Sequence, residues 1–200
     1  MKKGIGVMTG SFNPMQKSHL NLAKEVLRRF SQIEKIVFVP VGDHYQKPEL
    51  REAAYRYQIV QAVCEKQSNM EVSRIEMDQP RQLYTYETLA LLQQEYIDYD
   101  LYLIMGGDNL AEFDTWQHYL EILQRYYIIA FSRENNKVAK IVESHEELKK
   151  FKNRISLIDS RHILEISSTQ VRRYCNKGKS IKDLVPKEVY RVIQQNNLYE

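Results

Sequence analysis

Short runs of β-branched and aromatic residues alternate with helical patterns along most of this chain. The apolar runs cover residues 5–8, 35–41, 101–105, 126–131 and 155–158. Between them apolar side chains recur with helical spacing, as at Ala23, Val26 and Leu27. The alternation predicts an α/β fold: a doubly wound parallel sheet with helices on both faces. A weaker, half-polar run at residues 70–75 is expected near an edge of that sheet.

The pattern changes after residue 165, where only helical segments follow, at residues 168–175 and 186–196. We therefore expect a single domain over residues 1–200, with an α/β core in 1–165 and a helical C-terminal appendage in 166–200. Three stretches look irregular: residues 42–51, residues 79–83 and a charged segment at 134–140. Right-handed crossovers would place the carboxyl ends of all strands along one edge, where ligands bind.

Composition excludes several classes of protein. The 200 residues carry a formal net charge of +3, which suits an enzyme of polyphosphates but is too weak to imply nucleic-acid binding. Two isolated cysteines, Cys64 and Cys175, make neither a disulfide framework nor a zinc site. The chain begins directly with a strand, and no apolar run approaches membrane-spanning length. We expect a cytoplasmic protein with no membrane partner.

A turn and a helix start follow the first strand. Residues 10–14 read Gly-Ser-Phe-Asn-Pro, and His19 lies where the next helix should begin. Free backbone N–H groups and the positive end of the helix dipole meet at such a corner, so it favours an anionic group. The sequence thus predicts a site for phosphoryl chemistry here.

A second phosphate-binding pattern lies in residues 166–173, Ile-Ser-Ser-Thr-Gln-Val-Arg-Arg. Ser168 or Thr169 would cap the helix, and Arg172 would lie above both on one face. Hydroxyls, free amides and a guanidinium together suit a phosphate clamp. The same features also suit a capped helix with a solvated arginine, and local sequence does not choose between the two.

Three further positions are ambiguous on local features. Gly106 and Asp108 end a strand, where Asp108 would cap the next helix or accept a hydrogen bond from a ribose hydroxyl. Trp116, the only tryptophan, is either core or a stacking wall for a planar base. Lys47, in the loop after the second strand, would reach a polyphosphate or remain solvated.

The order of these motifs resembles the nucleotidyltransferase superfamily of the HxGH type, and more narrowly the nicotinate/nicotinamide mononucleotide adenylyltransferases. Residues 10–14 with His19 match the first motif of that family, and residues 166–172 match its ISSTxxR motif. Residues 83–89, Leu-Tyr-Thr-Tyr-Glu-Thr-Leu, resemble its bacterial SYTxxTL segment. In the bacterial His-x-Gly-His pattern, however, this chain has Gln16 and Ser18 at the first and third positions. Gln can donate a hydrogen bond to phosphate but carries no positive charge.

The resemblance implies transfer of the adenylyl group of ATP to a pyridine mononucleotide, with release of pyrophosphate, in NAD biosynthesis. The implied catalytic residues are His19, Arg172 and Lys47. The implied ATP-binding residues are Gly10, Ser11, Phe12, Gln16, His19, Gly106, Asp108, Ser168, Thr169 and Arg172. The implied mononucleotide-binding residues are Asn13, Tyr84, Thr85, Trp116 and Arg133. Mg²⁺ would be held through substrate phosphates, without a dedicated protein metal site.

Other functions remain open at this stage. Another adenylyl- or cytidylyltransferase of the superfamily shares the first motif, and Gln16 suits a non-catalytic nucleotide-binding regulatory module. An RNA-binding module is the weakest reading, because no basic face interleaved with aromatic residues is visible. The bacterial-type segments favour nicotinate over nicotinamide mononucleotide without deciding between them. A homo-oligomer is possible, but the sequence does not fix the oligomeric state.

Overall fold

A computed structural model describes residues 2–132, 135–163 and 166–199 of the chain. In these residues the strands form one six-stranded sheet with the order β3-β2-β1-β4-β5-β6. The strands are β1 Gly4–Gly10, β2 Ile33–Pro40, β3 Met70–Val72, β4 Asp100–Gly106, β5 Tyr127–Ser132 and β6 Ile155–Asp159. Every neighbouring pair is parallel. The predicted doubly wound sheet is confirmed, and the half-polar run at 70–75 forms only the short edge strand β3.

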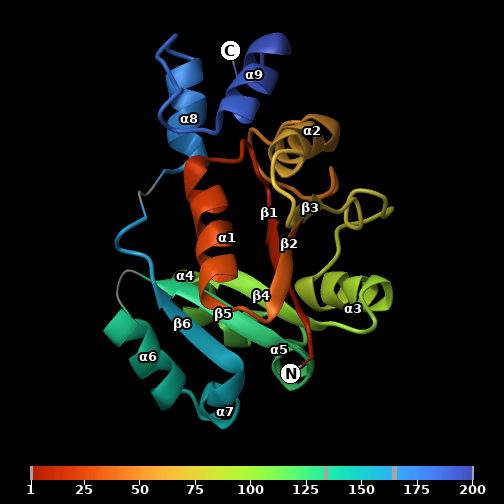
Figure 1. The fold of residues 1–200 in the computed structure, drawn as a ribbon, viewed down its shortest axis with the longest axis vertical. Helices are drawn as coiled ribbons and strands as arrows, with labels where there is room; N and C mark the ends of the chain where they lie inside the picture. The colour runs from red at the N-terminus through yellow and green to blue at the C-terminus, as the bar shows by residue number, and fades with distance from the viewer. Residues whose placement is uncertain (1, 133–134, 164–165, 200) are drawn as a thin grey trace.

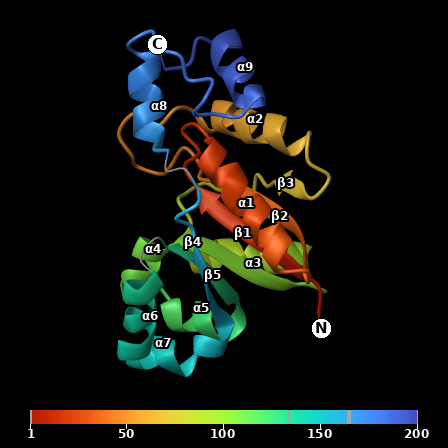
Figure 2. The same cartoon turned by 60° about the vertical axis from the view of Figure 1, so that its left-hand side comes forward.

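Helices follow the strands and cover both faces of the sheet (Figures 1 and 2). They are α1 Lys17–Arg29, α2 Ala53–Cys64, α3 Thr85–Glu95, α4 Gly107–Ala111, α5 Tyr119–Arg125, α6 Asn135–Ser144, α7 Glu146–Lys150, α8 Ser168–Cys175 and α9 Lys187–Gln195, with single 3-10 turns η1 Phe113–Thr115 and η2 Lys152–Arg154. No helix among the described residues is long and apolar enough to cross a membrane.

The period-two alternation along each strand divides the core into two apolar clusters. In β1, Ile5 and Val7 belong to the cluster beneath α3 to α7, whereas Met8 belongs to the cluster beneath α1, α2, α8 and α9. Gly6 also faces this second layer, and a Cβ there would lie 2.5 Å from Cδ1 of Ile36. A glycine at this position therefore lets neighbouring side chains pack directly over β1.

The expectation of an irregular charged segment at residues 134–140 is wrong for its described part. Helix α6 begins at Asn135 and continues to Ser144. Val138 and Val142, four residues apart, are 5% and 6% exposed and pack in the cluster on that side of the sheet. This buried stripe stabilises the helix although the surrounding residues are charged.

The C-terminal helices continue the core rather than standing apart from it. Val171 of α8 and Val189 of α9 are fully buried in the same cluster as α1 and α2, and α9 packs against α2. Both views show α8 and α9 at the end of the molecule opposite α6 and α7. The expected division of the chain at residue 165 stays a prediction.

The strand order reverses between β1 and β4, so the connections from these strands leave toward opposite faces. A crevice therefore opens beyond the carboxyl ends of β1 and β4, at Gly10 and Gly106. The first motif and the Gly106–Asp108 segment both begin at this point. The fold places the predicted ligand edge where the sequence expects it.

Candidate active site

The two phosphate-binding motifs meet in space. Nε2 of Gln16 donates to Oγ of Ser168 at 2.6 Å, across 152 residues of sequence, and Ser168 Oγ in turn donates to the carbonyl of Pro14 at 3.1 Å. The starts of α1 and α8 lie side by side in both views (Figures 1 and 2). Gln16 is only 3% exposed. The residue that replaces the first histidine of the bacterial pattern thus anchors the second motif.

The start of α8 differs by one residue from the expectation. Ser167, rather than Ser168 or Thr169, is the N-cap, and its Oγ accepts a hydrogen bond from the amide of Gln170 at 3.0 Å. Ser168 is the first helical residue, and its hydroxyl is taken by the contacts with Gln16 and Pro14. Ser168 therefore joins the two motifs instead of capping the helix.

Arg172 projects from α8 toward the turn of the first motif. Its Nη1 donates to the carbonyl of Asn13 at 3.0 Å, and its Nη2 lies 3.3 Å from Oγ1 of Thr169, as the helical spacing predicts. Nε and Nη2 also donate to one carboxylate oxygen of Glu49, at 3.1 and 3.0 Å. Sequence reasoning missed Glu49. It lies in the loop after β2 and holds the guanidinium where phosphate oxygens are expected.

The side chain of His19 is neutral and can donate a hydrogen bond. Its Nδ1 accepts a hydrogen bond from the amide of Gln16 at 3.1 Å, so the proton of the neutral ring lies on Nε2. The ring meets Phe12 edge-on, with centroids 5.2 Å apart. Although part of its surface is accessible, burial among protein atoms lowers the pKa of His19 to about 4. The Nδ1 contact acts in the same direction, because protonation would remove the acceptor.

A cavity of about 400 Å³ lies at the carboxyl ends of β1 and β2. It is lined by Thr9, Gly10, Ser11, Val41, Tyr45, Lys47, Glu76, Gln82, Leu83, Tyr84, Thr85, Asn109 and Trp116. Six of these are predicted site residues: Gly10, Ser11, Lys47, Tyr84, Thr85 and Trp116. Trp116 is half-buried and packs on Phe113, with ring centroids 5.2 Å apart. A supported indole with one face on a cavity is suited to stack on a planar ring.

Other predicted residues do not line this cavity. The side chain of Asn13, 2% exposed, donates to the carbonyl of Glu49 at 2.8 Å and accepts from the amide of Arg51 and the hydroxyl of Tyr199. These internal contacts give Asn13 a structural task, and its contact with the mononucleotide stays a prediction. Asn13 ties the first motif to the loop after β2 and to the C-terminal segment.

The Gly106–Asp108 segment also departs from the expectation. Gly106 is the N-cap of α4, and Asp108 is the second helical residue, so the prediction that Asp108 caps this helix is wrong. Its side chain is exposed, and contact with a ribose stays a prediction. Arg133 lies outside the described residues.

Glu76 is a cavity residue that sequence reasoning missed. It follows the edge strand β3 and is 7% exposed. Burial raises the pKa of Glu76 to about 7, against the opposing effects of a hydrogen bond from Thr88 and the charge of Arg56. The available signal was its place directly after the run at residues 70–75, which the sequence predicts as an edge strand.

This pKa predicts a pH-dependent stability difference. The pKa of Glu76 in the folded state lies above the ordinary value of 4.5. The contribution of Glu76 to the free energy of unfolding is therefore complete below about pH 4.5, where the side chain is protonated, and is lost as the pH rises through 7. Glu76→Gln should therefore raise the melting temperature more at pH 8 than at pH 5, with a stability gain on the order of 2–3 kcal/mol at the higher pH. Thermal unfolding of both proteins across this range measures the difference, and an equal shift at every pH would contradict it.

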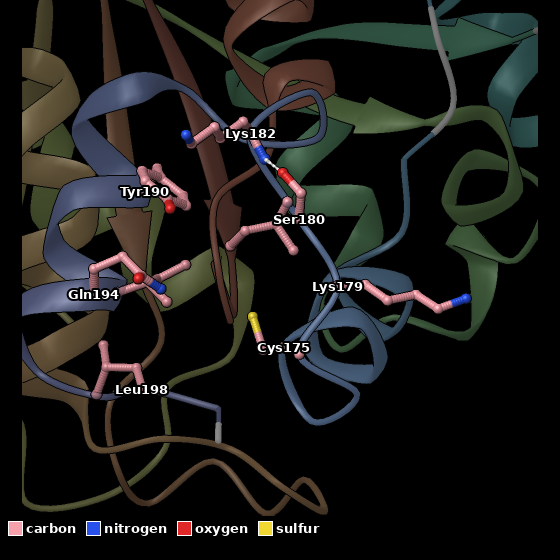
Figure 3. A pocket seen from close by; sticks show the side chains of 10 residues that line it. Cys175, Lys179, Ser180, Lys182, Tyr190, Gln194 and Leu198 are labelled. Carbon is pink, nitrogen blue, oxygen red and sulfur yellow. Dashed lines mark hydrogen bonds between the residues drawn. The ribbon is translucent and has the colours of Figure 1, made fainter.

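A second cavity, of about 360 Å³, lies between α8 and α9 in the C-terminal part of the chain (Figure 3). Tyr190 and Gln194 of α9 line one side, and Cys175 of α8 lines the other. The lining shares no residue with the cavity beside Trp116. The second cavity is thus separate from the joined motifs.

Comparison with known proteins agrees with this geometry. Residues 7–174 match the cytidylyltransferase-like family. The chain belongs to this family. A probable nicotinate-nucleotide adenylyltransferase of Clostridium tetani (strain Massachusetts / E88) is 31% identical over 202 residues, with all of both chains covered. A protein of the same name from Clostridium botulinum (strain Hall) is 33% identical, covering 97% of this chain and 98% of that one. The protein is accordingly a family member of the nicotinate-nucleotide adenylyltransferase type.

Solved structures show the same fold at lower identity. The nicotinic acid mononucleotide adenylyltransferase of Plasmodium falciparum in complex with APC matches with a TM-score of 0.75 and 20% identity, over 98% of this chain and 97% of that one. The same enzyme in complex with NaAD matches with a TM-score of 0.75 and 19% identity, with the same coverage. The family member therefore shares the fold of this Plasmodium enzyme over nearly its full length.

Proposed function

We propose that this family member transfers the adenylyl group of ATP to nicotinate mononucleotide and releases pyrophosphate, a reaction of NAD biosynthesis. The observation that carries the proposal is the joining of the two motifs through Gln16, Ser168 and Arg172, beside a cavity walled by Trp116. The names of the Clostridium relatives and the ligands of the Plasmodium enzyme support the same substrates.

The chemistry is a displacement at phosphorus. An oxygen of the mononucleotide phosphate attacks the α-phosphorus of ATP, the bond from that phosphorus to the bridging oxygen breaks, and pyrophosphate leaves with the electron pair. Both reactants are anions, so the protein acts by positioning them and by stabilising charge. In our proposal Nε2 of His19 donates to the phosphate that gains charge, since no described residue accepts a hydrogen bond from that N–H.

The remaining residues bind the two substrates. Arg172, Lys47 and the amides at the start of α8 would hold the β- and γ-phosphates, with Ser168 and Thr169 at that start. The amides of Gly10, Ser11 and Phe12 would line the phosphate path, and Asp108 would accept from the adenosine ribose. Trp116 would stack on the pyridine ring, with Tyr84 and Thr85 beside it. Gly106 would let the ligand approach the end of β4.

The described residues contain no cluster of three His, Cys, Asp or Glu side chains that could hold a metal ion. In our proposal Mg²⁺ is bound by phosphate oxygens and water, while the protein holds the phosphates. When bound, the ion would neutralise charge on the leaving pyrophosphate. A cytoplasmic location and the oligomeric state stay predictions.

One assay tests the proposal. Pyrophosphate release should require both ATP and nicotinate mononucleotide, and nicotinamide mononucleotide should give less at equal concentration. Release with CTP in place of ATP would favour a cytidylyltransferase. Tight ATP binding without any release would favour a regulatory module.

Trp116→Ala should raise the KM for the mononucleotide by about tenfold, because stacking of an aromatic side chain on a base contributes about 1–3 kcal/mol. The KM for ATP should change little. Steady-state kinetics with each substrate varied in turn separates the two. Trp116→Phe keeps an aromatic wall and should recover most of the affinity, whereas equal losses in both variants would contradict stacking.

A further inference from the structure

Glu76 has a carboxyl group that the fold buries without neutralising. The buried carboxyl groups among the described residues belong to Glu25 and Glu76, which are 8% and 7% exposed. Glu25 pairs with Arg28 and Arg29, and these partners hold the pKa of Glu25 well below its usual range. Glu76 has no ion pair in the described part of the chain. A buried acid without a cation is unfavourable for folding, so such a residue points to a functional task.

Only one of the two carboxyl oxygens of Glu76 has a hydrogen-bond partner among the described residues. The hydroxyl of Thr88, itself fully buried, donates to Oε1 of Glu76 at 2.7 Å. Oε2 accepts no hydrogen bond from any described residue. Among the described residues, the hydroxyl of Tyr126 is the one buried side-chain polar atom without a hydrogen-bond partner. Oε2 of Glu76 also has no partner there, so it cannot be fully buried. Oε2 is therefore accessible, and Glu76 lines the cavity beside Trp116.

Arg56, whose charge acts on Glu76, is engaged elsewhere. On α2, the guanidinium of Arg56 donates to the carbonyls of Arg51, Ser11 and Gly42 and lies 3.4 Å from Oδ1 of Asp43. From the loop after β2, Tyr45 and Lys47 reach the same cavity, and from the start of α3, Tyr84 does so. The backbone of this loop lies close to that of Glu76, since a Cβ on Gly42 would lie 2.7 Å from the backbone carbonyl oxygen of Glu76. The contact that holds the carboxyl group is the hydrogen bond from Thr88.

We propose that Oε2 of Glu76 accepts a hydrogen bond from a ribose hydroxyl of the mononucleotide, which makes Glu76 a binding residue for that substrate. The inference rests on the proposed function. The chemistry of the substrate supports it: the carboxylate and phosphate of nicotinate mononucleotide are acceptors, and the ribose hydroxyls are its donors. An unpaired carboxyl oxygen in the cavity therefore complements the sugar.

The test is a thermodynamic cycle that combines variants of the protein with deoxy forms of the substrate. Affinity is measured by isothermal titration calorimetry, and KM is measured by steady-state kinetics. Glu76→Gln and Glu76→Met should each weaken binding of nicotinate mononucleotide about tenfold, a typical loss for a hydrogen bond to a charged group. The KM for ATP should be unchanged. The methionine variant removes both oxygens without stranding Thr88, whose hydroxyl already lies 3.4 Å from the carbonyl of Tyr84.

The 2′-deoxy and 3′-deoxy forms of the mononucleotide complete the cycle. One of them should bind the native protein about tenfold more weakly than the parent, yet bind Glu76→Gln no more weakly than the parent does. Glu25→Gln changes a buried acid that does not line the cavity and should leave mononucleotide affinity unchanged. Unchanged affinity in both Glu76 variants, or losses that simply add, would refute the contact. Absence of pyrophosphate release by the native protein would instead contradict the proposed function.

Discussion

His19→Asn should lower kcat by about 10²–10³-fold with little change in the fold. The asparagine oxygen can take the place of Nδ1 and accept from the amide of Gln16, so the start of α1 keeps its contact. The Nε2–H donor is lost, and with it the hydrogen bond that we assign to the transition state. Steady-state kinetics and circular dichroism measure the two effects separately.

A control variant and a pH profile also test the role assigned to His19. His162→Asn changes an exposed histidine outside the proposed site and should keep native turnover. Because the pKa of His19 is about 4, its ring is neutral across pH 6–8, and kcat/KM should show no step from His19 in that range. Near-native turnover in His19→Asn would refute the assignment of His19 as the catalytic donor.

Arg172→Ala should lower kcat/KM for ATP by about 10²-fold, since hydrogen bonds from a charged group contribute about 1.5–3 kcal/mol each. The KM for the mononucleotide should change much less, because Arg172 does not line the cavity beside Trp116. Arg172→Lys should recover only part of the loss, because an ammonium group lacks the planar fork that pairs with two phosphate oxygens. Arg173→Ala, an exposed neighbour, is the matched control.

Glu49 gives the same assignment a test in the opposite direction. Its carboxylate occupies Nε and Nη2 of Arg172, so ATP phosphates must displace it. Glu49→Gln should lower the KM for ATP a few-fold, a small effect because the Glu49 side chain is largely exposed and the ion pair is screened by water. A higher KM for ATP in Glu49→Gln would indicate that the carboxylate supports ATP binding instead.

Much of the fold could be predicted from local sequence. Apolar runs and helical spacing predicted β1, β2, β4, β5 and β6 within two residues at each end, because burial on both faces leaves a continuous apolar run. Helix α6 was missed, since charged residues obscure the apolar stripe formed by Val138 and Val142. The predicted end of β3 was also wrong, because an edge strand is little buried and its sequence therefore lacks a continuous apolar run.

The candidate site was predicted unevenly for a similar reason. Residues that carry a motif, such as His19 and Arg172, could be found without the structure. Glu49, Glu76 and Asn109 could not, because each lies in or beside a loop where ordinary surface carboxylates and amides are common. Asn13 is predicted to contact the substrate, and the structure adds three internal hydrogen bonds that tie it to segments 36 to 186 residues away in the chain.

The sequence by itself determined the layered α/β architecture and the two motifs. Both periodic burial and the residue types at the start of a helix depend on positions close together in the chain. Only the tertiary structure decided how those motifs work together. It showed that Gln16 holds Ser168, that Glu49 shares the guanidinium of Arg172, and that the buried Glu76 lines the cavity. These are contacts and burial states between segments distant in the chain, and they arise only when the strands bring their carboxyl ends to one edge.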